Sequence, residues 1–117
     1  QMRRLLIRVV DTGTGKTAAI NGYVVGGKTG TAQKAVPGVG YRSGKYIGSF
    51  VGLVPADNPR LAILVLMDEP KSGDYGGVVA APVFREIARQ ALLHLALPPQ
   101  PTELARAEAA SQPRARE

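Results

Sequence analysis

Residues 22–32 read GYVVGGKTGTA, a run of apolar and β-branched side chains interrupted by four glycines. The run predicts a β-strand, but so many glycines argue against a well-packed position at the centre of a sheet. They fit an edge strand, or a place where a second backbone or a ligand comes close. The triplet KTG at residues 28–30 is short enough to occur by chance, so its meaning depends on its surroundings.

Two further strands are predicted beyond a glycine- and proline-rich loop at residues 33–44. Residues 45–54 and 60–67 are rich in apolar side chains, and the sequence PADNP between them is short enough for a hairpin connection. The two strands should therefore be antiparallel neighbours. Because residues 61–67 are apolar throughout, we expect both faces of this sheet to be covered.

One helix is predicted before the three strands in the sequence and one after them. Residues 5–10 carry apolar side chains at helical spacing, and Gly13 should end this helix in the left-handed conformation. A second amphipathic pattern covers residues 78–97, with Pro82 in its first turn. This second helix can cover one face of the sheet, and the first is too short to cover the other. We therefore expect a piece of a longer polypeptide that does not fold well alone.

Composition and charge exclude several classes of function. The 117 residues include no Cys, which removes thiol catalysis, disulfides and Cys-ligated metal sites. The longest apolar run, residues 61–67, is far shorter than the ~18 residues of a membrane span. A formal net charge of +6 permits an anionic partner, but the basic residues are scattered and no recognition motif accompanies them. Nucleic-acid binding is therefore the weakest alternative, and neither a metal nor a cofactor is predicted.

The sequence GTGKT at residues 13–17 invites comparison with a phosphate-binding loop. A Walker loop requires G-x-x-x-x-G-K-[ST], which would place its first glycine where Val10 stands. Such a loop would also follow a strand, whereas a helical pattern precedes this one. The motif fails both requirements, so an ATPase is not predicted.

Three titratable residues are poor candidates for acid–base catalysis. His94 falls late in the predicted C-terminal helix, where its positive charge is favourable near the helix end. Asp68 and Glu69 are adjacent, which in a strand would place their carboxylates on opposite faces of the sheet. We therefore predict no paired-carboxylate site here.

Five segments, in this order, resemble one protein family. They are GTGK at 13–16, residues 22–34, SFVGLVPAD at 49–57, the stretch from DEP at 68–70 to YGG at 75–77, and AAPVF at 80–84. Together they resemble the C-terminal part of the transpeptidase domain of class B penicillin-binding proteins, closest to the septal cell-division type. The resemblance covers residues 1–97 and implies an α/β fold of the penicillin-binding and β-lactamase-like type, an antiparallel sheet with the C-terminal helix packed on one face. Residues 98–117 are expected to form a flexible tail.

The resemblance also implies roles for the K-T-G residues, which form the third active-site element of this family after S-x-x-K and S-x-N. Lys28 would supply positive charge and hold the hydroxyl of the S-x-N serine. Thr29, Gly30 and Thr31 would bind the substrate, and the hydroxyls of Thr29 and Thr31 would be offered to the carboxylate of the substrate or of a β-lactam. The backbone N–H of Thr31 would be one of two donors to the oxyanion.

The turn Tyr75-Gly76-Gly77 precedes the last helix and would, by the same resemblance, lie near the active-site cleft. The alternative is a plain turn whose glycines permit positive φ angles. The residues themselves do not decide between these two interpretations.

Neither S-x-x-K nor S-x-N occurs in the chain, since no Lys stands three positions, and no Asn two positions, after any of its serines. We therefore expect this chain alone to be inactive, with both motifs supplied by the remainder of the transpeptidase domain. The parent is expected to cross-link D-Ala-D-Ala stem peptides and to bind β-lactams without a cofactor, on the outer side of the bacterial inner membrane. Septal division proteins would be further partners. The alternatives are a non-catalytic module that binds a peptide or a partner through the edge strand, a β-lactam sensor fragment of the same fold, or an elongation-type synthase.

Overall fold

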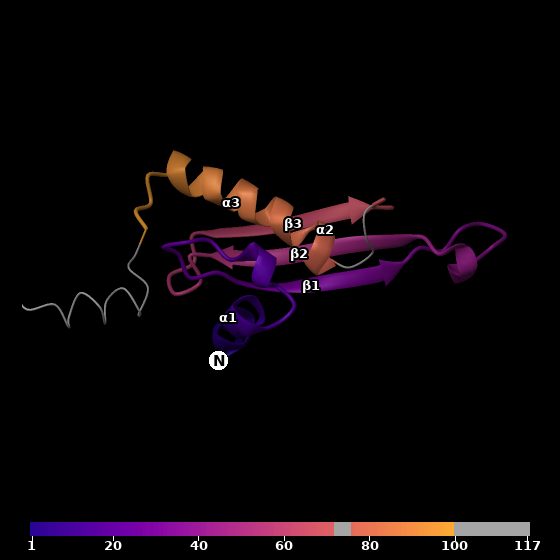
Figure 1. Ribbon diagram of the computed structural model, residues 1–117, viewed down its shortest axis with the longest axis horizontal. Coiled ribbons are helices and arrows are strands. Elements are labelled where there is room, and N and C mark those ends of the chain that lie inside the picture. Colours follow the sequence, from indigo (N-terminus) through magenta and orange to yellow (C-terminus); the bar gives the residue numbers. More distant parts are fainter. Residues whose placement is uncertain (72–75, 100–117) are drawn as a thin grey trace, which may run out of the picture.

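The structure is a computed structural model that describes residues 1–71 and 76–99. A three-stranded antiparallel sheet in the order β1-β2-β3 forms its centre (Figure 1). Helical elements precede and follow the sheet in the chain, so the predicted α/β fold with a C-terminal helix is confirmed. The strands are β1 (Gly26–Gln33), β2 (Tyr46–Val54) and β3 (Leu61–Asp68), and the helical elements are α1 (Met2–Thr12), η1 (Lys16–Ala18), η2 (Tyr41–Ser43), α2 (Gly76–Val79) and α3 (Ala81–His94).

The predicted hairpin is present as β2 and β3, which run antiparallel from the pair Ile47–Asp68 to the pair Val54–Leu61. The strand predicted at residues 22–32 begins later, at Gly26. Before it, the carbonyl of Val24 accepts a 2.7 Å hydrogen bond from the Ala56 amide in the connection between β2 and β3, one position out of the β1–β2 register. The backbone of Val24 is thus engaged before the regular ladder with β2 begins.

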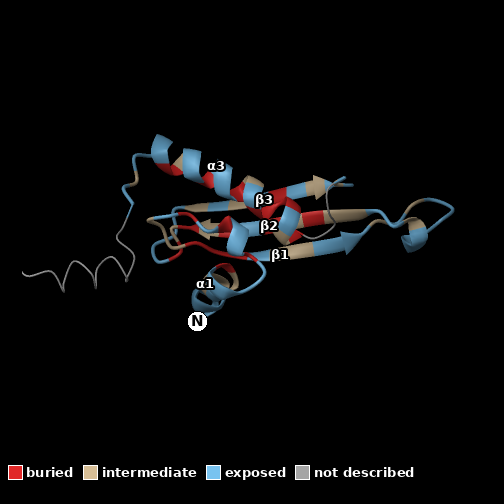
Figure 2. Cartoon of the chain, in the orientation of Figure 1, coloured by how far each residue is buried: buried red, intermediate tan, exposed pale blue. Residues whose placement is uncertain are grey.

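The hydrophobic core lies between α3 and one face of the sheet, where the buried residues gather (Figure 2). Phe50 of β2 and Phe84 of α3 are fully buried, and their ring centroids lie 4.8 Å apart with a tilt of 55°. Each buried aromatic side chain contributes roughly 1.5–3 kcal/mol through removal of its surface from water. A Cβ on Gly52 would lie 2.4 Å from the Phe84 ring, so this glycine makes room for the helix.

The helix predicted over residues 78–97 is wrong in its bounds, because the structure contains two helices, α2 and α3, separated at Ala80. Pro82 has no N–H with which to bond the carbonyl of Val78, and it therefore interrupts a continuous helix but suits the first turn of α3. After α3, the carbonyl of Leu97 accepts a 2.5 Å hydrogen bond from the Tyr23 hydroxyl. The tail predicted for residues 98–117 lies, from residue 100 onward, outside the described residues.

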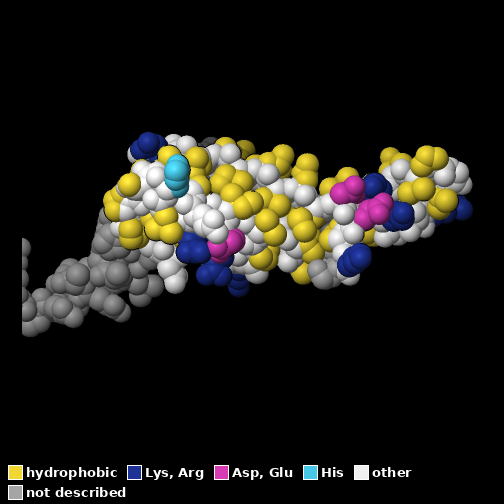
Figure 3. All heavy atoms as spheres, turned by 90° about the horizontal axis from the view of Figure 1, so that it is seen from above, with side chains coloured by type: hydrophobic (Ala, Val, Ile, Leu, Met, Phe, Trp, Pro, Cys, Tyr) yellow, Lys and Arg dark blue, Asp and Glu magenta, His cyan; other side chains and the backbone are white. Residues whose placement is uncertain are grey.

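The opposite face of the sheet is open over β2 and β3 within the described part of the chain. Val51, Leu64 and Leu66 are 45%, 60% and 61% exposed. Their neighbours in sequence face α3, since side chains alternate between the two faces of a strand. Figure 3 views the molecule from above the orientation of Figure 1 and shows hydrophobic side chains over much of that side of the surface as well. The two-sided cover expected from the apolar run is therefore not supplied by the residues described.

Helix α1 packs against β1, with Leu6 and Ile7 beside Gly26. The prediction that Gly13 ends this helix in the left-handed conformation is wrong, because its φ and ψ are −108° and −150°. Glycine is favoured there for a different reason: a Cβ would lie 2.9 Å from the Val9 carbonyl oxygen. Within residues 1–71 and 76–99, no helix has the length and apolar character needed to span a bilayer.

Candidate functional site

A pocket of about 430 Å³ opens along the K-T-G part of β1. Three segments far apart in the sequence line it: Thr14, residues 28–31 and residues 76–78. The structure thus brings six of the seven predicted site residues together. These six are Lys28, Thr29, Gly30, Thr31, Gly76 and Gly77. The seventh, Tyr75, lies outside the described residues.

The pocket lies at the open edge of the sheet, because β1 pairs with β2 on one side only. Just beyond their ladder, the Lys34 amide donates a 2.8 Å hydrogen bond to the carbonyl of Lys45, the residue opposite it. Antiparallel strands alternate hydrogen-bonded and non-hydrogen-bonded pairs, so the even-numbered residues of β1 bond to β2. Thr29 and Thr31 therefore direct their N–H and C=O groups outward from the sheet.

The ammonium group of Lys28 is held at this edge. Its Nζ donates a 2.9 Å hydrogen bond to the outward-facing carbonyl of Thr29 and lies 3.4 Å from Thr29 Oγ1. The side chain is otherwise exposed. It forms no ion pair with a carboxylate among the described residues. Its positive charge is available to an anion that enters the pocket.

Two threonine hydroxyls accompany this charge. Thr29 Oγ1 lies 3.1 Å from Thr14 Oγ1, at hydrogen-bond distance. Thr31 Oγ1 accepts a 3.2 Å hydrogen bond from the Gly76 amide. A hydroxyl that accepts in this way keeps its own proton for another acceptor. An ammonium and hydroxyls that converge beside outward backbone N–H groups form a suitable site for a carboxylate.

Gly76 and Gly77 are required by close packing. A Cβ on Gly76 would lie 2.6 Å from the Gly30 carbonyl oxygen and even closer to that of Ser49, and a Cβ on Gly77 would lie 2.5 Å from the Thr14 carbonyl oxygen. The positive-φ glycines among the described residues are others, at positions 22, 38, 40 and 44. The interpretation of a plain turn that needs positive φ is therefore wrong for these two glycines.

The sequence reasoning missed two residues that line the pocket, Val78 and, with its hydroxyl, Thr14. Thr14 belongs to the GTGKT segment, which was tested as a phosphate loop and rejected. Its contact with Thr29 joins residues 15 positions apart, and no local periodicity indicates such a contact. The available signal was that GTGK is among the five segments that resemble the family.

The sequence predicted that the carboxylates of Asp68 and Glu69 lie on opposite faces of the sheet, and this prediction is wrong. Lys34 Nζ lies 2.8 Å from Asp68 and 3.0 Å from Glu69, and Lys45 lies 3.5 Å from Glu69. Both carboxylates reach one ammonium because β3 ends at Asp68 and Glu69 has a φ of 51°. The hydrogen bond from Lys34 lowers the pKa of Glu69, and those to the two carboxylates raise the pKa of Lys34. The cluster is an exposed ion-pair network that joins the ends of all three strands.

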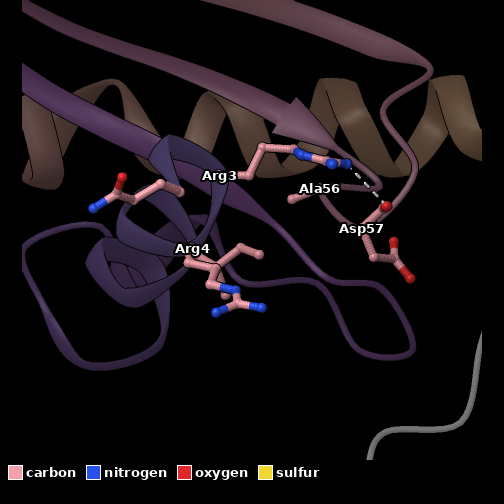
Figure 4. Close-up of a pocket in the computed structure, with 6 residues that line it drawn as sticks. Arg3, Arg4, Ala56 and Asp57 are labelled. Atoms are coloured by element: carbon pink, nitrogen blue, oxygen red, sulfur yellow. Dashed lines mark hydrogen bonds between the residues drawn. The ribbon is translucent and has the colours of Figure 1, made fainter.

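A larger pocket, of about 660 Å³, lies between α1 and the connection from β2 to β3 (Figure 4). There Arg3 Nη1 donates a 3.1 Å hydrogen bond to the carbonyl of Asp57, while Arg4 lies on another side of the opening. None of the predicted site residues that the structure describes lines this pocket. The smaller pocket is the better candidate, because the fixed ammonium, the hydroxyls and the outward N–H groups meet there.

Comparison with known proteins shows the family of the chain. A sequence model of the penicillin-binding protein transpeptidase domain matches residues 1–89. The chain belongs to this family. It is 46% identical over 101 residues to the probable peptidoglycan D,D-transpeptidase PenA of Neisseria flavescens, a match that covers 85% of this chain. The match spans only 25% of that relative, so this chain corresponds to a part of that longer protein.

Solved structures of transpeptidases share the fold of the segment. The transpeptidase domain of Burkholderia pseudomallei penicillin-binding protein 3 matches with a TM-score of 0.73 and 47% identity, over 83% of this chain and 30% of that one. Penicillin-binding protein 3 from Mycobacterium tuberculosis, in complex with ampicillin, matches with a TM-score of 0.76 and 37% identity, over 87% and 25%. The predicted membership in the class B penicillin-binding proteins is thereby confirmed.

Proposed function

We propose that the protein containing this segment is a penicillin-sensitive peptidoglycan D,D-transpeptidase, and that the 430 Å³ pocket receives the carboxylate end of its D-Ala-D-Ala stem peptide. One observation carries the proposal. The Lys28 ammonium, two threonine hydroxyls and the outward backbone groups of β1 meet at one open strand edge. The relative named a probable peptidoglycan D,D-transpeptidase supports the reaction.

The chemistry assigns a separate task to each group. Acyl transfer needs a nucleophile, donors for the oxyanion and a cation for the terminal carboxylate. In this proposal Lys28 and the hydroxyls of Thr29 and Thr31 bind the carboxylate, and the outward N–H of Thr31 donates to the oxyanion. An extended peptide adds to the open edge of β1 as a further strand, for which the backbone groups already point outward.

The nucleophile is assigned to the remainder of the transpeptidase domain, which supplies S-x-x-K and S-x-N. Its serine hydroxyl attacks the carbonyl of the penultimate D-Ala, the terminal D-Ala leaves as the amine, and the acyl-enzyme then passes to the amino group of a second stem peptide. Lys28 would also hold the S-x-N serine hydroxyl. β-Lactams, whose carboxylate imitates that of the substrate, would acylate the same serine; one structural relative is a complex with ampicillin.

The place of the parent protein in the cell is a finer proposal. On the resemblance to the septal type, we assign it to the division site, anchored in the inner membrane with its catalytic domain outside, where septal division proteins are its partners. A fluorescent fusion of the full protein should gather at midcell. Uniform labelling of the lateral envelope would indicate an elongation-type synthase instead.

The proposed activity is tested by covalent labelling of the complete protein. Its intact mass should rise by the mass of one penicillin molecule, and a synthetic stem peptide should release D-Ala. Labelling without release of D-Ala would indicate a β-lactam sensor of the same fold. Absence of both would leave a non-catalytic binding module and would contradict the proposal.

A further inference from the structure

We propose that Thr17 is a positioning residue of the transpeptidase site, which acts through Gly77 and Gly76 on the hydroxyl of Thr31. The inference rests on the proposed function, because it needs a carboxylate bound at Thr31. Thr17 is the last residue of the GTGKT segment at residues 13–17, from which the site described above takes only Thr14.

The backbone of Thr17 is fixed in place. It lies in the short helix η1, where the Ala18 amide donates a 3.0 Å hydrogen bond to the Gly15 carbonyl. Ala18 itself is fully buried in the core. The exposed hydroxyl of Thr17 is therefore carried by a rigid support, which is what a positioning group requires.

The hydroxyl of Thr17 donates a 2.7 Å hydrogen bond to the carbonyl of Gly77. This carbonyl belongs to α2, a helix of 4 residues. The last four carbonyls of any helix lack partners within the helix, so a helix this short depends on outside donors. Because the Gly77 backbone also packs directly on Thr14, the turn is held against the GTGKT segment by packing and by the Thr17 hydrogen bond together.

The same turn ends at the substrate pocket. The Gly76 amide donates to Thr31 Oγ1, which leaves the Thr31 proton free to be donated to a carboxylate. Thr17 thus holds the carbonyl of Gly77, and Thr31 accepts the hydrogen bond from the amide of the preceding residue, Gly76. Thr17 is not among the residues that line the pocket, so its influence on a ligand passes through the turn.

The test uses the complete transpeptidase that contains this segment, with a fluorescent penicillin as the probe. In Thr17→Val the half-saturating concentration for acylation should rise about three- to tenfold, as expected for the loss of one hydrogen bond. The limiting acylation rate should stay within about twofold, because the group aligned by Thr17 binds the carboxylate in ground state and transition state alike. Thr17→Ser should restore the wild-type value.

The matched control is Thr12→Val, which removes a hydroxyl bonded to the Arg8 carbonyl within α1, and it should behave as wild type. A double-mutant cycle then separates positioning from general stability. In the background Thr31→Val, the further change Thr17→Val should alter the half-saturating concentration by less than about twofold.

Equal effects of Thr17→Val in both backgrounds, or no effect in either, would overturn the inference while leaving the proposed function intact. An unlabelled wild-type protein would instead contradict the proposed function. Thermal melts accompany each variant, and Thr17→Ala replaces Thr17→Val if the valine variant does not fold.

Discussion

The Gly76 amide donates a 3.2 Å hydrogen bond to the hydroxyl of Thr31, 45 residues earlier in the chain. The contact places the start of α2 directly on the K-T-G strand. It also determines which atom of Thr31 is free for a ligand, because the hydroxyl oxygen already accepts one hydrogen bond.

This packing predicts a large effect of Gly76→Ala. The added Cβ would press against the backbone carbonyls of Ser49 and Gly30, which cannot rotate away as a side chain can. We expect a loss of about 1–3 kcal/mol in the free energy of unfolding of the complete transpeptidase, with slower acylation by penicillin. Chemical denaturation and acylation kinetics measure both.

The control for this change is Gly38→Asn, in a loop where an added Cβ would meet no atom within 4 Å. Its φ of 80° is a conformation that Asn tolerates better than other side chains. We expect near wild-type stability and acylation. If Gly76→Ala behaved like this control, the close packing of α2 on β1 would be refuted.

Tyr23→Phe should separate stability from function. It removes the hydrogen bond from the Tyr23 hydroxyl to the Leu97 carbonyl, which fastens the segment after α3 to the segment before β1. We expect a loss of about 1 kcal/mol in the free energy of unfolding, measured by urea denaturation. Acylation by penicillin should be unchanged, and a marked loss of acylation would mean that this contact also orients β1.

How much of this could be predicted from the sequence depends on the range of the interaction. The β2–β3 hairpin follows from two apolar runs with a short connection, and both Pro82 and the apolar stripe of α3 indicate its helix. Membership of the family and the six pocket residues were expected from KTG and YGG in their context. These features are local, or are carried by short motifs.

The features that escaped prediction arise from tertiary contacts. The Thr14–Thr29 and Thr17–Gly77 hydrogen bonds join segments 15 and 60 residues apart. Gly13 was expected to be left-handed, yet its role is to avoid the Val9 carbonyl. The convergence of Asp68 and Glu69 on Lys34 depends on where β3 ends, and periodicity fixes strand ends poorly.

The open face of the sheet predicts a difference between the segment and the complete domain. Leu64 is 60% exposed among the described residues, but we expect the remainder of the transpeptidase domain to cover it. Leu64→Asp should cost the complete domain about 2 kcal/mol or more, because it would bury a carboxylate without a partner. Urea denaturation of the domain measures this.

In the isolated chain of 117 residues, which we expect to melt without cooperativity, the same change should have little effect. Equal destabilisation of both proteins would show that this face is covered within the segment itself. A cooperative melt of the isolated chain would contradict the expectation that it does not fold well alone.

The ion-pair network predicts a small dependence of stability on pH. The hydrogen bond from Lys34 holds the pKa of Glu69 below its ordinary value of 4.5, so the folded state binds this proton less readily than the unfolded state. The resulting stabilisation is present above the ordinary value and is lost as pH falls through the lowered one. Glu69→Gln removes it.

Melting temperatures of the complete domain and of Glu69→Gln should therefore differ by no more than a few degrees near neutral pH, since exposed ion pairs contribute little. The difference should shrink as the pH is lowered from about 6 to about 3. A difference that grew on acidification would show that the ion pair does not stabilise the fold.

The most direct test of the proposed site is the rate of penicillin acylation of the complete transpeptidase with Lys28→Met. The Lys28 ammonium is exposed and donates to the Thr29 carbonyl, so its loss should leave the melting temperature nearly unchanged. The exposed Lys16, which does not line the pocket, provides the matched control Lys16→Met. We predict that Lys28→Met lowers the second-order acylation rate constant by about a hundredfold or more, while Lys16→Met stays within about twofold of wild type. Equal rates for the two variants would contradict the assignment of this pocket as the carboxylate site.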